Sequence, residues 1–553
     1  MPTGRGSLCA TLAQLPSSDN GFRRPPDSFQ STGDTLPGSN MTTDKVIVTN
    51  LSALQRKYST GFQRIHDAVG RLIAADKKRG LTTLVVAIDS AQDMRSVKGS
   101  PVTKASDQRQ VKAAIDAVWK AHAPDYLMIL GAPDVVPMQT LRNPAHGDGD
   151  ANVPSDLPYA CAVPYSSDPS AFLGATRVVG RLPDLVGSGN PAYLVSLLGT
   201  AARHRTRPRE DYQRYLGLSA QVWEASTALS LSKVFGNSTA LQTTPPRGPK
   251  WPDAQLALRA HFINCHGAPS TPKYYGQPPG REEYPVAHDA ARLKRKVSNG
   301  TVIAAECCYG AQLYDPEDSK GQAGICSTYL ADGAYGFFGS TTIAYGPSEG
   351  NGQADLICQF FLDAVLDGAS LGRAALEARQ RFAALYTHLD PTDLKTLAQF
   401  YLLGDPSVQA VAAVPHALSR TRAFKRTFKG ARTTPGARAF RRERLARTGT
   451  NLEHSLGSVR AIQARPPVHV TRALNAAAKE SGITELARQS YAVSFPKAAS
   501  GGEMKHFAAP RRGRSVYLLL GEKTESRRVK RVVVLAATVQ DGAIVHLRRV
   551  HSR

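Results

Sequence analysis

The sequence predicts an α/β fold in which helices cover both faces of a mostly parallel sheet. Between residue 45 and about residue 413, short apolar runs alternate with longer segments whose apolar residues have helical spacing. The short runs are continuously apolar, which is typical of parallel strands buried on both faces. With 553 residues, of which 42% are hydrophobic, the chain can bury a large core.

The expected elements follow one another along this region. Strands are predicted at 46–48, 84–89, 126–131, 177–181, 301–305 and 335–339. Helices are predicted at 58–78, 111–121, 192–204, 326–332, 355–366 and 371–386. The segments 220–226 and 256–264 are each a strand or a helix. Because reactive groups of such sheets lie outside the carboxyl ends of the strands, we expect the functional site there.

The composition changes on both sides of the α/β region. Residues 1–40 are rich in Gly, Pro, Ser and Asp, which predicts a disordered extension over 1–44. Residues 420–447 carry 11 basic residues and one acidic residue, which indicates a solvated linker over 414–465. For 466–553 we expect a small basic α+β module. Its predicted elements are a helix at 472–488, strands at 515–520 and 531–539, and a β-hairpin turn at Asp541-Gly542.

The positive charge is concentrated in the C-terminal extension. The chain has a net charge of +24 from 69 Lys and Arg and 45 Asp and Glu, and residues 420–553 hold 29 of the basic but only 8 of the acidic residues. One interpretation is a solvated linker followed by a small β-rich module. A second is binding of nucleic acid or another polyanion through residues 420–553.

The cysteines argue against a disulfide framework and a zinc ribbon. Seven cysteines are present, and none belongs to a CxxC pair. Reduced thiols are typical of a cytoplasmic protein, and this is the localisation we expect. No apolar run reaches the length of a transmembrane helix, and the stretch 8–15 is too interrupted for a signal peptide, so no membrane partner is expected.

Two predicted strand ends carry residues suited to nucleophilic catalysis. His266-Gly267 follows the apolar segment 260–265, and Cys308 follows the strand 301–305 in a loop of small residues. A thiolate is a strong nucleophile, and a nearby imidazole can take its proton and later protonate a leaving amine. Each residue alone is more often a plain loop histidine or a buried cysteine. Together they are a candidate catalytic pair, with the N–H groups of Gly267 and Cys308 as candidate oxyanion donors.

The double cysteine leaves the nucleophile open. Neighbouring residues of a strand point to opposite faces, so only one of Cys307 and Cys308 can face His266. Cys308 is favoured, and Cys307 is the alternative. Cys265 suggests a zinc site with these two cysteines. Since adjacent side chains such as Cys265 and His266 cannot easily reach one ion from a strand, no metal is expected.

The order of the motifs resembles the caspase-like superfamily of cysteine peptidases, and most of all the gingipain type. The segments that carry the resemblance are Leu130-Gly131 with Pro133-Asp134, 155–159 (SDLPY), 179–183 (VGRLP), His266-Gly267, Glu306-Cys307-Cys308, 334–340 (AYGFFGS) and 403–407 (LGDPS). The resemblance implies a caspase-like fold with two subdomains, 45–250 and 251–413, of which the second holds the His-Cys dyad. It also implies endopeptidase activity on protein or peptide substrates, after Arg or Lys, without a cofactor.

The resemblance does not locate every group that such an enzyme uses. Gingipain-type peptidases have an acidic catalytic partner and an acidic group for the basic substrate side chain. Asp156 and Glu306 are candidates for substrate binding, although a structural carboxylate is the alternative for each. Processing of the chain itself at Arg441-Arg442 or Arg511-Arg512 is a third interpretation of the basic extension. Two other functions remain open: a catalytically idle caspase-fold scaffold, and a polyanion-binding protein that acts through its basic module.

Overall fold

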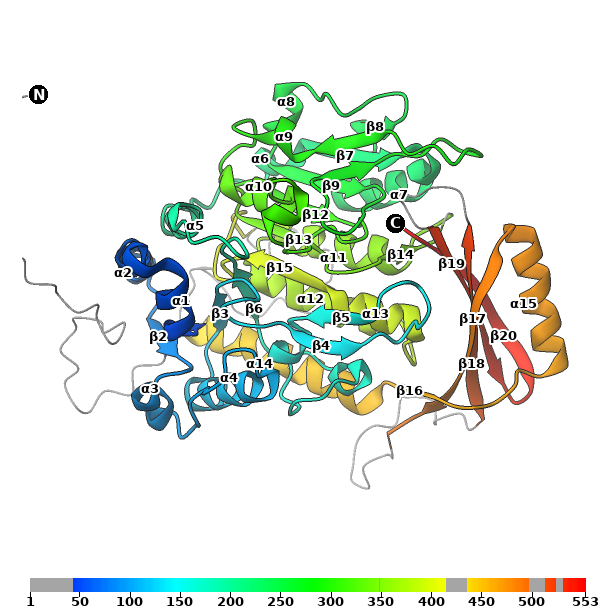
Figure 1. Ribbon diagram of the computed structural model, residues 1–553, viewed down its shortest axis with the longest axis horizontal. Coiled ribbons are helices and arrows are strands. Elements are labelled where there is room, and N and C mark those ends of the chain that lie inside the picture. Colours follow the sequence, from blue (N-terminus) through cyan, green and yellow to red (C-terminus); the bar gives the residue numbers. More distant parts are fainter. Residues whose placement is uncertain (1–42, 348, 414–434, 497–512, 524–530) are drawn as a thin grey trace, which may run out of the picture.

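The computed structural model describes residues 43–347, 349–413, 435–496, 513–523 and 531–553 (Figure 1). These residues form a large α/β unit with a smaller antiparallel sheet at one side. The predicted N-terminal extension lies outside the described residues as far as residue 42. Among the described helices, none has the length and apolar character needed to cross a membrane.

A ten-stranded sheet forms the centre of the α/β unit, in the order β2-β1-β3-β6-β15-β13-β12-β9-β7-β8. Its strands are β1 (Lys45–Thr49), β2 (Thr83–Ala87), β3 (Tyr126–Leu130), β6 (Val179–Leu182), β7 (Tyr215–Ala220), β8 (Leu241–Thr244), β9 (Ala260–Asn264), β12 (Val302–Ala305), β13 (Gly336–Ser340) and β15 (Phe400–Gly404). All neighbouring strands are parallel except β13 and β15. The predicted α/β fold with a mostly parallel sheet is confirmed.

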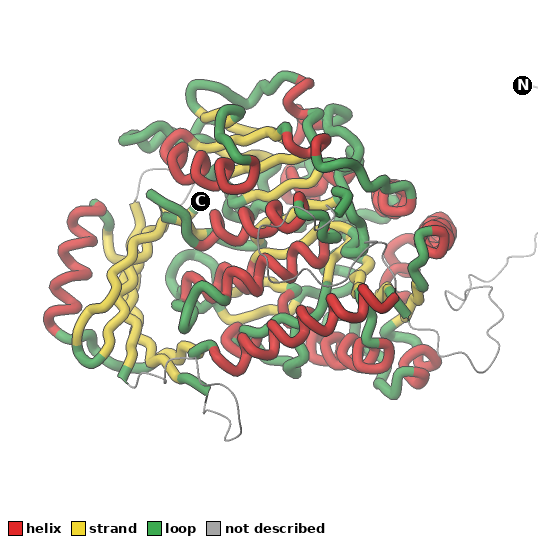
Figure 2. Tube along the Cα trace, turned by 180° about the vertical axis from the view of Figure 1, so that it is seen from behind, coloured by secondary structure: helices red, strands yellow, loops and turns green. Residues whose placement is uncertain are grey.

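Helices cover both faces of the sheet (Figure 2). In one layer α2, α5, α10 and α9 contact one another in that order, and in the other α7, α11, α12 and α14 (Pro435–Ser455) do so. The helices of the unit are α1 (Leu51–Tyr58), α2 (Phe62–Lys78), α3 (Ala91–Ser96), α4 (Gln108–His122), α5 (Ala192–Ala202), α6 (Glu210–Gln213), α7 (Glu224–Phe235), α8 (Asp253–Leu256), α9 (Ala290–Leu293), α10 (Ile325–Ala331), α11 (Gln353–Leu366), α12 (Leu371–Ala383) and α13 (Pro391–Gln399). Two small antiparallel pairs, β4 (Gln139–Arg142) with β5 (Asn152–Ser155) and β10 (Lys273–Tyr275) with β11 (Val286–Asp289), lie outside the sheet.

Buried ion pairs connect distant segments of this unit. Arg181 of β6 donates to both carboxylate oxygens of Asp156, at 2.8 and 2.6 Å. Lys45 of β1 pairs with Asp76 at 3.1 Å and with Asp405. All five side chains are buried, and a buried charge is tolerated only with a partner of this kind. Three of these residues, Asp156, Arg181 and Asp405, belong to the segments that resemble the gingipain type, and they hold the fold together.

The second sheet has six antiparallel strands in the order β14-β20-β19-β18-β17-β16. They are β14 (Tyr345–Gly346), β16 (Ser458–Ala461), β17 (Thr484–Ser494), β18 (Arg514–Lys523), β19 (Arg531–Gln540) and β20 (Ala543–Ser552), and helix α15 (Val468–Ser481) packs on one face. The hairpin turn at Asp541-Gly542 is confirmed. The predicted helix at 472–488 is wrong beyond residue 481, because Gly482 ends α15 in a left-handed conformation and β17 follows.

We call residues 458–553 the C-terminal module. Its sheet is completed by β14, which belongs to the loop after β13 of the α/β unit, so the two parts share an edge strand (Figure 1).

Helix α14 (Pro435–Ser455) corrects the prediction of a solvated linker for this segment. Leu445 and Leu452 are buried, and Gln380 of α12 donates to the carbonyl oxygen of Leu445 at 2.7 Å. Arg442 donates to the carbonyl oxygen of Ala123 at 2.7 Å. The prediction was wrong because α14 has many basic residues and only a few apolar residues, and these few pack against the α/β unit. The rest of the predicted linker, up to residue 434, lies outside the described residues.

Candidate active site

The candidate catalytic residues lie beyond the carboxyl ends of two adjacent parallel strands. His266 follows β9, and Cys308 follows β12. The two loops are in direct backbone contact, because a Cβ atom on Gly267 would overlap the carbonyl oxygen of Cys308. Only glycine allows this close approach. The topology therefore brings the predicted His and Cys to one place, as expected for the carboxyl edge of a parallel sheet.

His266 is held between two aromatic rings and one amide. Its ring centroid lies 4.3 Å from that of Trp223 and 5.0 Å from that of Tyr284. Its Nε2 atom lies 2.8 Å from Oε1 of Gln277, whose amide nitrogen donates to a backbone carbonyl and to Glu282. Because the amide oxygen of Gln277 can only accept, this network assigns the proton of His266 to Nε2. Within the part of the chain that the structure describes, Nδ1 has no hydrogen-bond partner and can accept a proton.

Burial keeps both candidate catalytic groups neutral. It lowers the pKa of His266 to about 3, and the nearby charges of Arg531 and Arg553 act in the same direction. Burial also raises the pKa of the Cys308 thiol to about 12. At neutral pH the pair therefore rests as a thiol and a neutral imidazole, which is the form that can act as a general base.

The two neighbouring cysteines have different surroundings. The Sγ atom of Cys308 lies 3.6 Å from the carbonyl oxygen of Ala344, in the loop that leads to β14. The Sγ atom of Cys307 lies 4.0 Å from the carbonyl oxygen of Ile263 of β9 and is fully buried. Burial and the neighbouring Cys265 raise the pKa of Cys307 well above its usual range. Both cysteines are buried, but Cys307 contacts β9 whereas Cys308 contacts the loop that leads to β14, and Cys308 stays the candidate nucleophile.

The backbone carbonyl of Arg553 lies between the two candidate catalytic loops. Its oxygen accepts from the N–H of Cys308 at 3.2 Å and from the N–H of Gly267 at 3.5 Å. Two backbone donors that converge on one carbonyl oxygen are suited to stabilise the negative charge of a tetrahedral intermediate. The structure therefore brings together the two N–H groups that the sequence nominates as oxyanion donors.

The side chain of Arg553 fills a closed pocket beside this carbonyl. Its Nη2 atom lies 2.8 and 3.0 Å from the carboxylate oxygens of Asp355 and 3.0 Å from the carbonyl oxygen of Pro347. The guanidinium carbon lies 4.5 Å from the centre of the Trp223 ring, a cation–π contact. A side chain at Gly346 would overlap the guanidinium, so glycine opens this space. The pocket matches a planar cation on a long stem.

Asp355 and Glu306 form the acidic end of this pocket. Asp355, in the first turn of α11, accepts from the N–H of Gly352 at 3.1 Å and from the hydroxyl of Ser226 at 3.4 Å. Glu306 is buried, and burial together with the charge of Asp355 raises its pKa well above the usual range. This shift favours the neutral form of Glu306, and Asp355 is the carboxylate that contacts the guanidinium. Of the two sequence candidates for substrate binding, Glu306 lies behind the pocket, whereas Asp156 is committed to its ion pair with Arg181 elsewhere in the fold.

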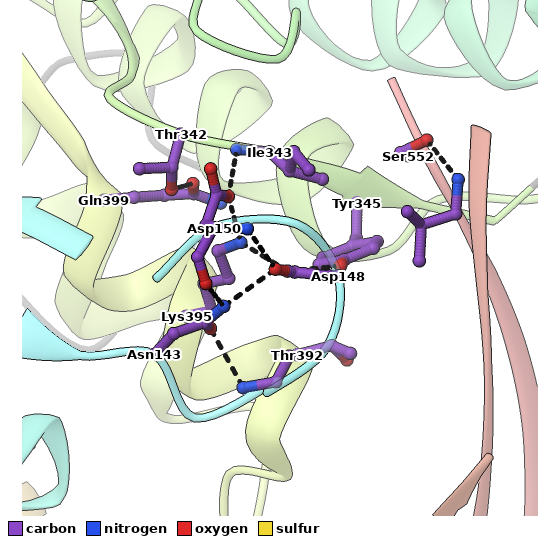
Figure 3. A network of polar contacts seen from close by, with 12 residues as sticks. Asn143, Asp148, Asp150, Thr342, Ile343, Tyr345, Thr392, Lys395, Gln399 and Ser552 are labelled. Atoms are coloured by element: carbon purple, nitrogen blue, oxygen red, sulfur yellow. Dashed lines mark hydrogen bonds and ion pairs between the residues drawn. The ribbon is translucent and has the colours of Figure 1, made fainter. Parts of the chain in front are cut away.

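A buried polar cluster supports the strand that runs beside this site (Figure 3). Lys395 of α13 pairs with Asp148 and, at 2.6 Å, with Asp150, and all three side chains are buried. Asp148 accepts from the hydroxyl of Tyr345 in β14, and Asp150 accepts from that of Tyr309, each at 2.6 Å. Because Tyr309 follows Cys308, the cluster fixes both the nucleophile loop and β14.

Several side chains of the site have no counterpart among the sequence candidates, among them Trp223, Gln277, Tyr284, Asp355 and Arg553. A signal existed only for Asp355, since the glycine-rich loop 346–352 leads into a predicted helix and acidic residues are favoured in a first turn. Trp223 follows β7, and Gln277 follows β10, whose backbone pairs with His266. Only the packing of these segments places both residues against the imidazole.

Comparisons with known proteins give one family match and two similar solved structures. Residues 260–411 match the family model described as Peptidase family C25. A structure described as "Structure of Protease" is 13% identical, covering 93% of this chain and 98% of its own, with a TM-score of 0.43. The complex of the pro- and mature domains of Porphyromonas gingivalis RgpB is 10% identical, covering 92% of this chain and 99% of its own, also with a TM-score of 0.43. A search among curated proteins gives no match.

The family match includes both candidate catalytic loops. It begins with β9, which leads to His266, contains Cys308 and Asp355, and ends after β15. It coincides with the part of the sheet that carries the dyad. Residues 260–411, which include both candidate catalytic loops, are therefore similar to peptidase family C25, and they lie within the α/β fold described above.

Proposed function

We propose that the protein is an endopeptidase that cleaves after arginine through His266 and Cys308. The observation that carries this proposal is the position of Arg553. Its carbonyl oxygen faces the N–H groups of Gly267 and Cys308, while its guanidinium faces Asp355. An arginine of a substrate that binds in the same way presents its carbonyl carbon to the loop that carries the Cys308 thiol.

The neutral pair suits the chemistry of peptide hydrolysis. Nδ1 of His266 takes the thiol proton, and the sulfur of Cys308 forms a bond to the carbonyl carbon. The oxygen becomes negative and is held by the two backbone N–H groups. Collapse of this intermediate breaks the C–N bond, and the imidazolium gives its proton to the leaving amine. Water, deprotonated by His266, then attacks the thioester, which releases the acid and restores the thiol.

The shape of the pocket favours arginine over lysine. The planar guanidinium lies over the Trp223 ring and bonds to both Asp355 and the Pro347 carbonyl. Lysine carries a compact ammonium group that cannot stack on the indole ring in this way. We therefore expect a preference for arginine before the cleaved bond.

Fluorogenic peptides with Arg, Lys or Gln before the cleaved bond test this function. They are assayed with the wild type and, because Arg553 occupies the pocket, with Arg553→Ala. We expect the Arg peptide to be cleaved fastest, with a loss on the order of 1000-fold in Cys308→Ala and His266→Ala. Cys307→Ala retains activity. Full activity in Cys308→Ala, or cleavage of no peptide by either form, contradicts the proposal.

Binding of polyanions through residues 420–553 stays a prediction. Part of the basic charge already has partners, since Arg531, Arg548 and Arg553 contact carboxylates of the α/β unit. Retention of the protein on heparin or DNA at low salt tests the remainder. The processing site suggested at Arg441-Arg442 lies in helix α14, and Arg511-Arg512 lies outside the described residues.

A further inference from the structure

We propose that the C-terminal module is a built-in inhibitor whose residues 551–553 occupy the substrate site. This inference rests on the function proposed above. Strand β20 pairs with β14 in antiparallel fashion, with Ser552 opposite Tyr345 and His551 opposite Gly346. The N–H of Arg553 donates to the carbonyl oxygen of Ala344 at 2.9 Å. Extended peptides bind to a sheet edge by adding a strand in this way.

Residues 551–553 use three features that a substrate also needs: the edge of β14, the pair of oxyanion donors and the arginine pocket. Arg553 is 1% exposed, and its guanidinium is enclosed by Asp355, Trp223 and the Pro347 carbonyl. A second arginine cannot enter while this side chain is in place. Binding of Arg553 and binding of a substrate therefore exclude each other.

Contacts outside the site hold the module in this position. Arg548 of β20 pairs with Asp390 and, at 2.8 Å, with Asp393 at the start of α13. Arg531 of β19 pairs with Glu282 at 2.7 Å, next to the amide of Gln277 that orients the catalytic imidazole. These contacts lie on the same two strands that form the β19–β20 hairpin. They keep Arg553 at a high effective concentration near its pocket, which strengthens an intramolecular ligand.

Through Glu282 the C-terminal module also contacts the residues that surround His266. Glu282 accepts from Gln277 at 3.3 Å and also from the hydroxyl of Tyr284, which lies against the His266 ring. The module thus covers both sides of the site: β20 fills the substrate strand position, and Arg531 contacts the loop that holds the base. Activation then requires β20 to leave β14 and the Arg548 anchor to open.

The experiment compares Arg553→Ala with Arg549→Ala in the full chain. Arg549 is the matched control, because it lies on the same strand but points to Ser481 of α15, at 3.3 Å. Two rates are measured: hydrolysis of an arginyl fluorogenic peptide, and alkylation of Cys308 by iodoacetamide, located by peptide mass. We expect Arg553→Ala to raise both rates by roughly 100-fold, the scale of a lost intramolecular ligand, while Arg549→Ala leaves both unchanged.

A second variant, Arg548→Ala, keeps Arg553 but removes the anchor, and we expect an intermediate rise of both rates. If Cys308 is alkylated no faster in Arg553→Ala and in Arg548→Ala than in the wild type, the inhibitor proposal is overturned. The proposed function fails by a different result. If Cys308 is alkylated faster in Arg553→Ala but no peptide is cleaved, residues 551–553 do cover the site, and the proposed endopeptidase function is wrong. If Arg553→Ala shows no cooperative unfolding transition, this variant is not folded. The two rates of Arg548→Ala then decide whether the inhibitor proposal holds.

Discussion

The Nε2 atom of His266 lies 2.8 Å from the amide oxygen of Gln277, so a neutral side chain orients the candidate base. A carboxylate in this place would stabilise the imidazolium and raise the pKa of His266. The amide instead fixes the tautomer without adding charge, which agrees with a pKa of about 3 that is set mainly by burial. In the proposed function the thiol proton goes to Nδ1, which has no hydrogen-bond partner among the described residues.

The role of Gln277 predicts a change in turnover. In the Arg553→Ala background, Gln277→Ala frees the imidazole to rotate, and we expect kcat to fall about 100-fold, the cost of a catalytic group displaced by about 1 Å. Gln277→Glu raises the pKa of His266, so the acid limb of the kcat profile moves to higher pH. Gln63→Ala, on the exposed face of α2, is the control. An unchanged kcat in Gln277→Ala contradicts this role.

The acidic end of the pocket predicts a change in specificity. In the Arg553→Ala background, Asp355→Asn removes the charge that faces the substrate guanidinium, and we expect kcat/KM for an arginyl peptide to fall between about 10-fold and 150-fold, as for a lost hydrogen bond to a charged group. For a citrullyl peptide, whose side chain is neutral, we expect kcat/KM to stay unchanged. Asp363→Asn, on the same helix α11 but paired with Arg381 at the surface, serves as the comparison. Equal losses for both peptides would show that Asp355 acts only on the fold.

The close approach of the two catalytic loops predicts that Gly267 tolerates no side chain. Gly267→Ala pushes the loop away from Cys308 and moves one oxyanion donor, so kcat falls about 100-fold to 1000-fold. Gly70→Ala, in α2, has open space around the added methyl and gains about 1 kcal/mol of stability from helix propensity. Activity and thermal unfolding of the two variants are measured together. If Gly267→Ala keeps the wild-type kcat, the N–H group of Gly267 is not an oxyanion donor.

The buried thiol predicts the pH dependence of alkylation. A raised pKa means less thiolate at any given pH, so burial makes Cys308 slow to react. With a pKa of about 12, the wild-type rate rises about tenfold per pH unit between pH 7 and 10 and reaches no plateau. In Arg553→Ala, water enters, the pKa falls and the rate levels off at lower pH. Iodoacetamide labelling of Cys308 across this range gives both curves, and a wild-type plateau below pH 9 contradicts the burial.

The polar cluster behind β14 predicts a loss of stability. Lys395→Met leaves the buried carboxylates of Asp148 and Asp150 without their cation, and we expect the free energy of unfolding to fall by about 3–5 kcal/mol. Lys296→Met breaks an exposed pair with Asp253 and costs less than about 1 kcal/mol. Denaturant unfolding of the wild type and both variants measures the difference.

Local patterns along the chain determined the α/β layers and the positions of the two catalytic loops. Continuous apolar runs mark buried strands such as β3 and β12, and the residues just beyond a parallel strand lie at the reactive edge. This placed His266 and Cys308 at one edge before any contact was known. Charge counts were a poorer guide, because the basic segment 435–455 forms helix α14 through a few buried leucines.

The tertiary structure alone decided which groups surround these loops. Trp223, Gln277, Asp355 and Arg553 come from segments far apart in the sequence, and no local period relates them to His266. Their positions follow from the order of the strands in the sheet and from the pairing of β20 with β14. Periodicity records whether a residue is buried, whereas the partner it meets depends on how distant elements pack.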